Sequence, residues 1–252
     1  MIFADNLEKT YSVAPVNPFR RGARIPALAG ATLRVGEGEA VALVGRNGAG
    51  KTTLLKILST LVLPDGGRAS VCGRDVAASP RAARAALGLV TGDERSLYWR
   101  LTGEQNLSLF GALYNIPPRE LRPRVARALA DFGLENHAAV PVRSYSSGLR
   151  QRLMLARALL HEPRVLLMDE PNRAADPILQ GEFIARVRDE IAGRMNRSVL
   201  LATHNLEEAV SLGGDVAVIE KGRIVFFGRP AGVAELRELM AGFTSGNPNR
   251  RS

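Results

Sequence analysis

The stretch Gly45–Thr53 (GRNGAGKTT) has the composition of a phosphate-binding loop. It fits the pattern G-x-x-x-x-G-K-[ST], with Gly45, Gly50, Lys51 and Thr52 at the fixed positions. Glycines let the backbone turn tightly around an anion while successive N–H groups point inward. We therefore predict that Lys51 contacts the terminal phosphates of a nucleoside triphosphate and that the Thr52 hydroxyl binds Mg²⁺. The other nucleotide contacts expected in this loop are Asn47, Gly48 and Thr53.

The segments on either side of this loop are those that the motif requires. Glu39–Val44 (EAVALV) is a short apolar run typical of a buried strand. The segment Thr52–Leu63 carries leucines at helical spacing, namely Leu54, Leu55, Leu58 and Leu61. The positive end of such a helix would add its partial charge to the anion site. Strand, glycine loop and helix together predict nucleotide binding rather than a simple glycine-rich turn.

Two further strand ends carry groups that could act on a bound triphosphate. RVLLMDE places Asp169 and Glu170 directly after an apolar strand, and SVLLAT is followed by His204. Ligand sites in parallel sheets gather at the carboxyl ends of strands. We predict that Asp169 holds Mg²⁺, directly or through water, and that Glu170 orients and deprotonates the attacking water. A neutral His204 imidazole could hydrogen-bond the γ-phosphate, whereas His137 and His161, at helix ends or in loops, are interpreted as structural.

The rest of the chain alternates apolar strands with helical segments, which predicts an α/β fold with a mostly parallel sheet. Lys221-Gly222 between two apolar runs predicts a hairpin turn. Strands are expected over 1–11, 28–35, 68–72, 87–91, 165–168, 198–203, 215–220 and 223–227, helices over 80–86 and 178–192, and a mainly helical region over 93–142. The Pro- and Arg-rich segment 12–27 is expected to be a loop, and the tail 244–252 is expected to be disordered.

Composition and charge narrow the class of protein. Hydrophobic residues make up 46% and charged residues 23% of 252 residues, as in globular proteins, and no run of residues is long and apolar enough for a membrane span. MIFADNLEKTY lacks the basic start and apolar run of a secretory signal, and a single cysteine fits a reducing compartment, so we expect a cytoplasmic location. The net charge of +9 comes largely from scattered arginines. Scattered arginines of this kind are typical of a solvent-exposed face. Attraction to an anionic membrane surface and contact with nucleic acid are the two other interpretations of the charge.

A third motif gives these features a family resemblance. YSSGLRQR, at Tyr145–Arg152, is similar to the signature LSGGQ-x-QR of the nucleotide-binding subunits of ATP-binding cassette transporters. Many nucleotide-binding proteins have the glycine loop and the acidic strand, but few have this element before the second carboxylate motif. In the family the signature opens a helix and contacts the γ-phosphate of ATP bound to a partner subunit. Ser146 and Gly148 fill those positions here.

The resemblance covers Asp5–Leu236 and implies a fold. We expect a phosphate-loop NTPase core with a mostly parallel sheet, an N-terminal antiparallel β subdomain and a helical signature subdomain, all within residues 1–243, with the helical part at about 93–160. ATP and Mg²⁺ are the implied cofactors. Tyr11 resembles the aromatic residue that stacks on adenine, although a buried strand tyrosine or competition from Phe19 stays open. Asp176 resembles the aspartate of the dimer-interface loop, and His204 matches the switch histidine.

Three departures from the family pattern concern the same site. Asp93 stands where the family usually has a glutamine that touches Mg²⁺ and water, and its carboxylate could still offer an oxygen to the metal. Ser147 replaces the first signature glycine, so a Cβ occupies a place where backbone approaches phosphate closely. Asn172 and Ala175 replace the usual Thr or Ser and Leu of the dimer-interface loop. Each departure suggests slow or asymmetric turnover rather than loss of ATP binding.

The resemblance implies an ATPase subunit of a membrane transporter, peripheral on the inner face of the cell membrane. Its partners would be a membrane-spanning permease and a second cassette subunit, in a homodimer or a heterodimer, with two ATP molecules between the cassettes. ILSTLVLPDGG and TGDERSLYWRLTGEQNL resemble exporters of the family. A cassette ATPase of translation or chromosome maintenance is a second hypothesis, disfavoured by the single set of motifs and the lack of heptads. A nucleotide-gated module with weak hydrolysis is the third, and nucleic acid is not an expected partner.

Overall fold

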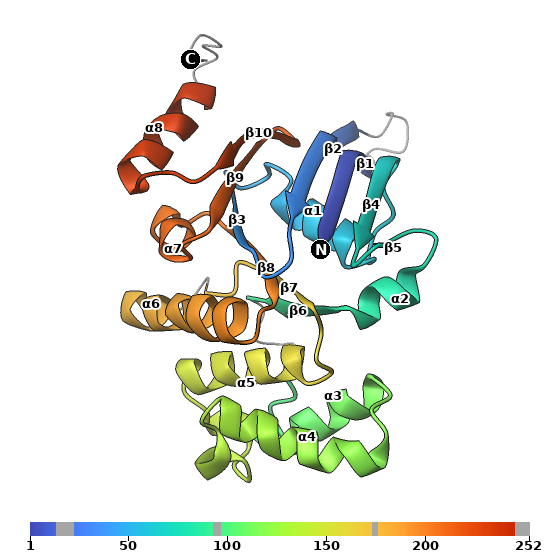
Figure 1. The fold of residues 1–252 in the computed structure, drawn as a ribbon, viewed down its shortest axis with the longest axis vertical. Helices are drawn as coiled ribbons and strands as arrows, with labels where there is room; N and C mark the ends of the chain where they lie inside the picture. The colour runs from blue at the N-terminus through green and yellow to red at the C-terminus, as the bar shows by residue number, and fades with distance from the viewer. Residues whose placement is uncertain (14–22, 93–96, 173–175, 245–252) are drawn as a thin grey trace.

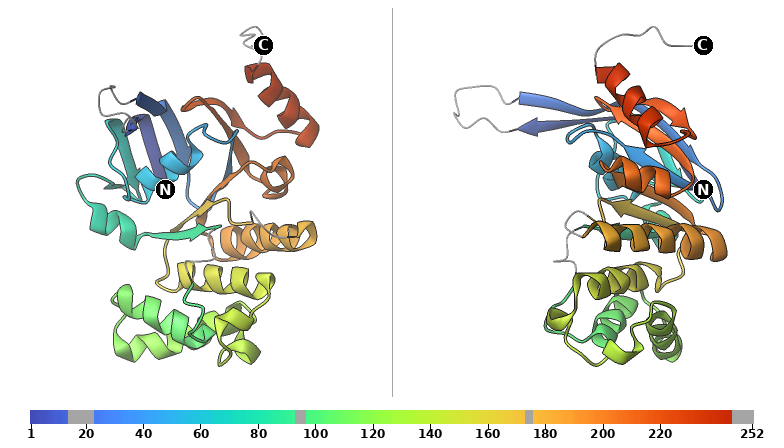
Figure 2. Two further views of the ribbon diagram at one scale, coloured as in Figure 1. Left: turned by 180° about the vertical axis from the view of Figure 1, so that it is seen from behind. Right: turned by 90° about the vertical axis from the view of Figure 1, so that its left-hand side faces the viewer.

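The structure is a computed structural model, and it describes residues 1–13, 23–92, 97–172 and 176–244. Its strands form two sheets, one of six strands in the order β10-β9-β3-β8-β7-β6 and one of four in the order β2-β1-β4-β5. Three layers are visible in Figure 1: the four-stranded sheet, the six-stranded sheet with its helices, and a group of helices at the far end of the molecule; Figure 2 shows the same layers from two further sides. The described part of the chain contains no helix that is long and apolar enough to cross a membrane.

The six-stranded sheet is parallel apart from its last strand. Its members are β3 (Ala40–Val44), β6 (Leu87–Thr91), β7 (Val165–Asp169), β8 (Ser198–Thr203), β9 (Asp215–Glu220) and β10 (Arg223–Gly228). Strand β3 explains why both faces are buried: Val41 and Leu43 enter one hydrophobic core, and Ala42 and Val44 enter the other. This sheet confirms the predicted α/β class.

The hairpin β9–β10 is confirmed, with Lys221 and Gly222 both at positive φ, as a tight two-residue hairpin turn requires. The antiparallel sheet implied by the family resemblance is also present, but its strands are longer than predicted. It contains β1 (Ile2–Val13), β2 (Ala23–Val35), β4 (Gly66–Val71) and β5 (Arg74–Asp75). The prediction of a loop from residue 12 was wrong at both ends, because Tyr11 pairs with Ile25 and Ser12 with Arg24. Proline at residue 26 did not end the strand because β2 is an edge strand of this sheet.

Helix α1 (Lys51–Leu58) packs against both sheets, where it buries Leu54, Leu55, Ile57 and Leu58. It is shorter than the predicted helix to Leu63, since Thr60 has a positive φ. Leu61, the last leucine of the predicted helical face, is therefore exposed. The short helix α2 (Pro80–Ala85) leads into β6, as predicted.

The predicted helical region is present as a separate layer below the parallel sheet (Figure 1). It consists of α3 (Gly103–Leu113), α4 (Pro118–Asp131) and α5 (Ser147–Leu159), which contact one another. The remaining helices follow the later strands: α6 (Pro177–Arg186), continued by a π-helix (Val187–Arg194), α7 (Leu206–Ser211) and α8 (Val233–Thr244). Thr244, assigned to the tail, ends α8, and the rest of that tail lies outside the described residues.

Candidate functional site

The glycine loop connects the end of β3 with the start of α1, as the motif predicts. Gly50 caps α1 with φ 114°, and a Cβ at this position would lie 2.6 Å from the carbonyl oxygen of Ala27. Gly48 has φ 81°, a conformation that side chains disfavour. A Cβ at Gly45 would lie 2.5 Å from the Ile219 carbonyl oxygen. A side chain would clash with backbone at Gly45 and Gly50 and would be strained at Gly48, so glycine preserves a backbone path in which N–H groups can face an anion.

The predicted carboxylates reach this loop because β3, β8 and β7 are parallel neighbours. In the strand register Val44 lies beside Thr203 and Ala202 lies beside Asp169, so the three carboxyl ends converge. The Thr52 hydroxyl donates to Asp169 across 3.2 Å between Oγ1 and Oδ1. Adjacent ligands of an octahedral Mg²⁺ lie about 3 Å apart, and Mg²⁺ prefers such hard oxygens. This oxygen pair therefore fits a magnesium ion bound together with phosphate.

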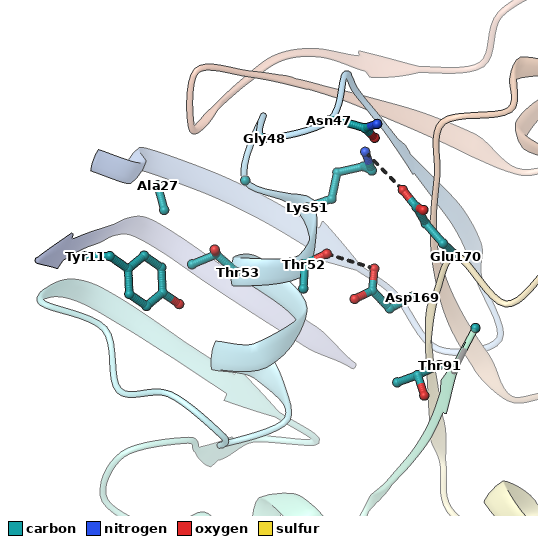
Figure 3. A pocket seen from close by; sticks show the side chains of 12 residues that line it. Tyr11, Ala27, Asn47, Gly48, Lys51, Thr52, Thr53, Thr91, Asp169 and Glu170 are labelled. Atoms are coloured by element: carbon teal, nitrogen blue, oxygen red, sulfur yellow. Dashed lines mark hydrogen bonds and ion pairs between the residues drawn. The ribbon is translucent and has the colours of Figure 1, made fainter. Parts of the chain in front are cut away.

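Lys51, Glu170 and His204 form a second group at the loop, and the contact between Lys51 and Glu170 is drawn in Figure 3. The Lys51 ammonium donates to the carbonyl oxygens of Gly45 (2.7 Å) and Arg46 (3.3 Å), and its nitrogen lies 3.6 Å from Glu170 Oε1. His204 Nδ1 lies 3.4 Å from the same carboxylate oxygen. Glu170 has φ 46°, an uncommon conformation for a residue with a side chain. Such backbone strain is concentrated at functional sites.

Burial changes the proton affinity of two groups in this site. Lys51 is only 4% exposed, and this desolvation lowers the pKa of its ammonium, while Glu170 partly opposes the shift. Desolvation likewise raises the pKa of Asp169, and the hydrogen bond from Thr52 partly opposes that shift. A buried lysine that lies in a loop of this pattern, with its ammonium beside the Glu170 carboxylate, is placed to exchange that contact for a more highly charged anion.

A cavity of about 910 Å³ joins these groups (Figure 3). Nine of the residues that the sequence assigned to the site line it: Tyr11, Asn47, Gly48, Gly50, Lys51, Thr52, Thr53, Asp169 and Glu170. Three lining residues, Ala27, Thr91 and Gly92, were missed. Thr91 ends β6 and Gly92 follows it, so their position at a carboxyl strand end was a usable signal, whereas Ala27 belongs to a part of β2 that was assigned to a loop.

Tyr11 lies on β1 at the opposite side of this cavity from the carboxylates (Figure 3). It is 37% exposed, which contradicts the alternative interpretation as a buried strand tyrosine. Asp65 fixes the part of β1 just before Tyr11, since its carboxylate accepts hydrogen bonds from Lys9 Nζ and Thr10 N, both at 2.7 Å. Phe19, the competing aromatic residue, lies outside the described residues.

The remaining predicted site residues that the structure describes do not line this cavity. Gly45 is buried and contributes its carbonyl oxygen to Lys51. His204 lines a neighbouring pocket that it shares with Glu170. Asp93 falls outside the described residues.

The signature residues lie on the helical layer. Ser146 is the exposed N-cap of α5 and accepts a hydrogen bond from Leu149 N at 3.3 Å. Gly148 lines a different, small pocket. The structure thus brings the glycine loop and the strand-end carboxylates together in one chain. The signature residues lie apart from both.

The two other histidines have structural surroundings, in agreement with their interpretation. His161 stacks on Tyr114 with 3.9 Å between ring centroids, and its Nε2 lies 3.0 Å from the Leu87 carbonyl oxygen. Burial lowers the pKa of His161, which favours the neutral ring. His137 packs edge-on against Tyr145, whose hydroxyl donates to the His137 carbonyl oxygen at 2.6 Å.

Comparisons with known proteins agree with this geometry. The ABC transporter family profile matches residues 28–173. The daunorubicin resistance ATP-binding protein DrrA2 of Streptomyces coeruleorubidus is 45% identical over 210 residues, which are 83% of this chain and 64% of that protein. The ABC transporter ATP-binding protein NatA of Bacillus subtilis (strain 168) is 32% identical over 207 residues, 81% of this chain and 82% of that protein.

Solved structures show the same architecture. A dimeric structure of MJ0796, described as a bacterial ABC transporter cassette, has a TM-score of 0.76 and 25% sequence identity, and it covers 92% of this chain and 100% of that chain. The chain spans less than two thirds of DrrA2, and the same holds for DrrA3 of that species, of which 62% is covered. Profile, relatives and fold agree with the three motifs of the site: the chain belongs to the ABC transporter family, as one of its ATP-binding cassettes.

Proposed function

We propose that this protein hydrolyses ATP as a dimer of cassettes and that this cycle drives a separate membrane-spanning partner. The observation that carries the proposal is the division of the site. The phosphate loop, Asp169, Glu170 and Tyr11 line one cavity, whereas Ser146 caps a helix in another layer of the same chain. A second copy that presents its own Ser146 and the N-terminus of its α5 would complete the cavity.

Different residues that line the cavity would bind different parts of ATP. Tyr11 would stack on the adenine ring, and the loop N–H groups together with Lys51 would hold the phosphates. Thr52 and Asp169 would hold Mg²⁺, which when bound neutralises charge on the β- and γ-phosphates. Because Lys51 already lies against the loop carbonyl groups, its ammonium is preorganised at the place where the triphosphate would bind.

Hydrolysis would depend on Glu170 and His204. The Glu170 carboxylate would accept a proton from the water that attacks the γ-phosphorus, while the bond to the β-phosphate oxygen breaks and ADP leaves. Its contact with Lys51 would be replaced when the γ-phosphate takes the lysine, which frees the carboxylate for the water. His204 would donate a hydrogen bond to the γ-phosphate from the position it now holds beside Glu170.

The names of the relatives support a role in transport. DrrA2 is described as a daunorubicin resistance ATP-binding protein and NatA as an ABC transporter ATP-binding protein. The MJ0796 cassette forms a dimer. We therefore propose an exporter that places this chain on the inner face of the cell membrane, bound to a permease, with a second cassette of the same or a related sequence. The net charge of +9 is compatible with an anionic membrane surface.

A complementation experiment tests this shared site. Lys51→Ala removes the phosphate contact and Ser146→Arg blocks the exposed helix tip, so each protein alone should lose ATP turnover. An equimolar mixture should recover about a quarter of the wild-type rate, because about half of randomly formed dimers are mixed and each mixed dimer keeps one intact site. Phosphate release is the measurement, with the permease in membrane vesicles if the cassette alone turns over slowly.

A control variant distinguishes a shared site from a general loss of activity. Ser144 is also exposed and lies two residues before Ser146, so Ser144→Arg serves as the matched control and should keep wild-type turnover. A mixture that is as inactive as each variant, beside an active wild type, would contradict the shared site. A wild type that binds ATP but releases no phosphate with its permease would instead favour the nucleotide-gated module.

A further inference from the structure

A buried network of polar side chains links the signature helix to the strand end that carries His204. Gln151 of α5 donates from Nε2 to Asn172 Oδ1 at 3.0 Å. Asn172 donates from Nδ2 to Glu208 Oε1 of α7, also at 3.0 Å. Thr203, at the end of β8, donates to the other oxygen of Glu208 at 2.6 Å. These four residues, named the relay here, are at most 7% exposed.

Asn172 occupies the centre of the relay. A carboxylate only accepts hydrogen bonds, so the amide must turn its NH₂ group to Glu208 and its oxygen to Gln151. Its backbone carbonyl oxygen also accepts from Gln180 Nε2 of α6 at 3.2 Å. Asn172 thereby connects α5, α6 and α7 within the described residues, two positions after Glu170. The threonine or serine that is usual in the family would have to donate and accept through one hydroxyl oxygen, whereas the amide joins Gln151 and Glu208 through two separate atoms.

The relay ends at the segment that holds His204. Thr203, the residue before it, donates to Glu208 and accepts from Asn205 N at 3.0 Å. Asn205, the residue after it, caps α7 by accepting from the backbone N–H groups of Glu207 and Glu208. Both neighbours of His204 are therefore fixed, while its own side chain is exposed.

The relay also adjoins the catalytic pair. A pocket of about 50 Å³ is lined by Glu170, Asn172, Gln180, Thr203, His204, Asn205 and Glu208. A shift of Asn172 would change the shape of this pocket directly. Buried networks of this kind hold one arrangement because each broken bond leaves an unpaired polar group in a dry environment.

We propose that Asn172 is a positioning residue that couples the signature helix α5 to the placement of His204 and Glu170. This inference rests on the proposed function for the roles of Ser146 and His204. In the dimer the signature of a chain completes the site of the other copy, while His204 serves its own site. The relay therefore links the two ATP sites through the interior of each chain, so that contact of α5 with one nucleotide changes the catalytic geometry at the other.

The test exchanges the donor and the acceptor in the hydrogen bond between Asn172 and Glu208. Asn172→Asp places two carboxylates within hydrogen-bond distance in a buried site, which raises the pKa of the pair. Glu208→Gln alone keeps an acceptor for Asn172 and should have a small effect. The double variant Asn172→Asp/Glu208→Gln restores every donor and acceptor. In it, Gln151 and the amide introduced on α7 both donate to the carboxylate introduced at the centre, and Thr203 donates to the oxygen of that amide.

The first readout needs neither turnover nor a dimer. The chain has three histidines, so the imidazole NMR signal of His204 can be assigned by its loss in His204→Asn. In nucleotide-free protein Asn172→Asp should displace this signal from its wild-type position at neutral pH, and the double variant should return it. The displacement should shrink as the pH falls, because one proton on the pair lets a carboxylic O–H replace the lost donor. Asn172→Leu, which cannot form that bond, should show no such recovery.

The second readout separates positioning from binding. The Asn172→Asp protein should keep its ATP affinity but lose about tenfold in kcat, and the double variant should regain most of it, since contacts in one network couple by about 1–2 kcal/mol. Thermal unfolding confirms that the variants fold. The proposed coupling is overturned if the His204 signal of folded Asn172→Asp stays at its wild-type position. It is also overturned if the His204 signal of the double variant is displaced as far as that of Asn172→Asp. A wild-type protein that does not hydrolyse ATP would contradict the proposed function, but the NMR test of the relay would still apply.

Discussion

The Glu170→Gln protein should bind ATP with nearly wild-type affinity and lose about 10²–10⁴-fold in the rate of hydrolysis, the usual contribution of a general base. The physical reason is that an amide cannot accept the proton of the attacking water, while its size and shape preserve the pocket. The contact to Lys51 is long, at 3.6 Å, and would be given up when phosphate binds, so its loss should cost little affinity. Single-turnover phosphate release and equilibrium ATP binding measure the two quantities separately.

Glu207→Gln is the matched control for this substitution. Glu207 lies on α7, exposed, and pairs with Arg237 at 3.6 Å on the surface. Surface ion pairs of this kind contribute little, so the control should keep both affinity and rate. A Glu170→Gln protein that hydrolyses ATP at the control rate would exclude Glu170 as the base.

Lys51→Ala should weaken the binding of ATP by roughly ten- to a hundredfold, because a hydrogen bond to a charged group contributes about 1.5–3 kcal/mol. The Lys51 side chain is buried and donates to two loop carbonyl groups, so the substitution also removes a support of the loop itself. The effect should be larger for ATP than for ADP, since the ammonium is placed for the terminal phosphates. Calorimetric titration with both nucleotides gives the two affinities.

Lys56→Ala provides the control for charge. Lys56 is exposed on the last turn of α1, on the same helix as Lys51. Its removal changes the net charge by the same amount without touching the loop and should leave the ATP affinity within about twofold. Equal losses in the two variants would assign the effect to general electrostatic attraction and contradict the specific role of Lys51.

The place of the glycine loop between β3 and α1 was predictable because its signals are local. Gly45, Gly50, Lys51 and Thr52 are adjacent in sequence, and backbone geometry alone explains why glycines stand where Cβ atoms would meet Ala27 and Ile219. Asp169 and Glu170 follow an unbroken apolar strand, and the rule that sites gather at carboxyl strand ends placed them correctly. The parallel sheet followed from the same apolar runs.

Features that depend on contacts between distant segments were not predictable. Strand β2 was assigned a late start because prolines and arginines favour loops, but pairing of Tyr11 with Ile25 overrides that local preference. The proposed role of Asn172 shows the same limit: the sequence presented this residue only as a departure from the family pattern in the dimer-interface loop. Its bonds to Gln151 and Glu208, distant in the chain, appear only when α5 and α7 are packed together.

An ATP site that is shared between two chains can be detected by the molar mass of the Glu170→Gln protein in ATP and Mg²⁺, measured by analytical ultracentrifugation with and without Ser146→Arg. We expect a species of twice the chain mass of 27.1 kDa with ATP, reversal to the single-chain mass with ADP, and no dimer when Ser146→Arg is added. A Glu170→Gln protein that saturates with ATP yet stays at the mass of one chain, both alone and with its permease, would contradict the shared site.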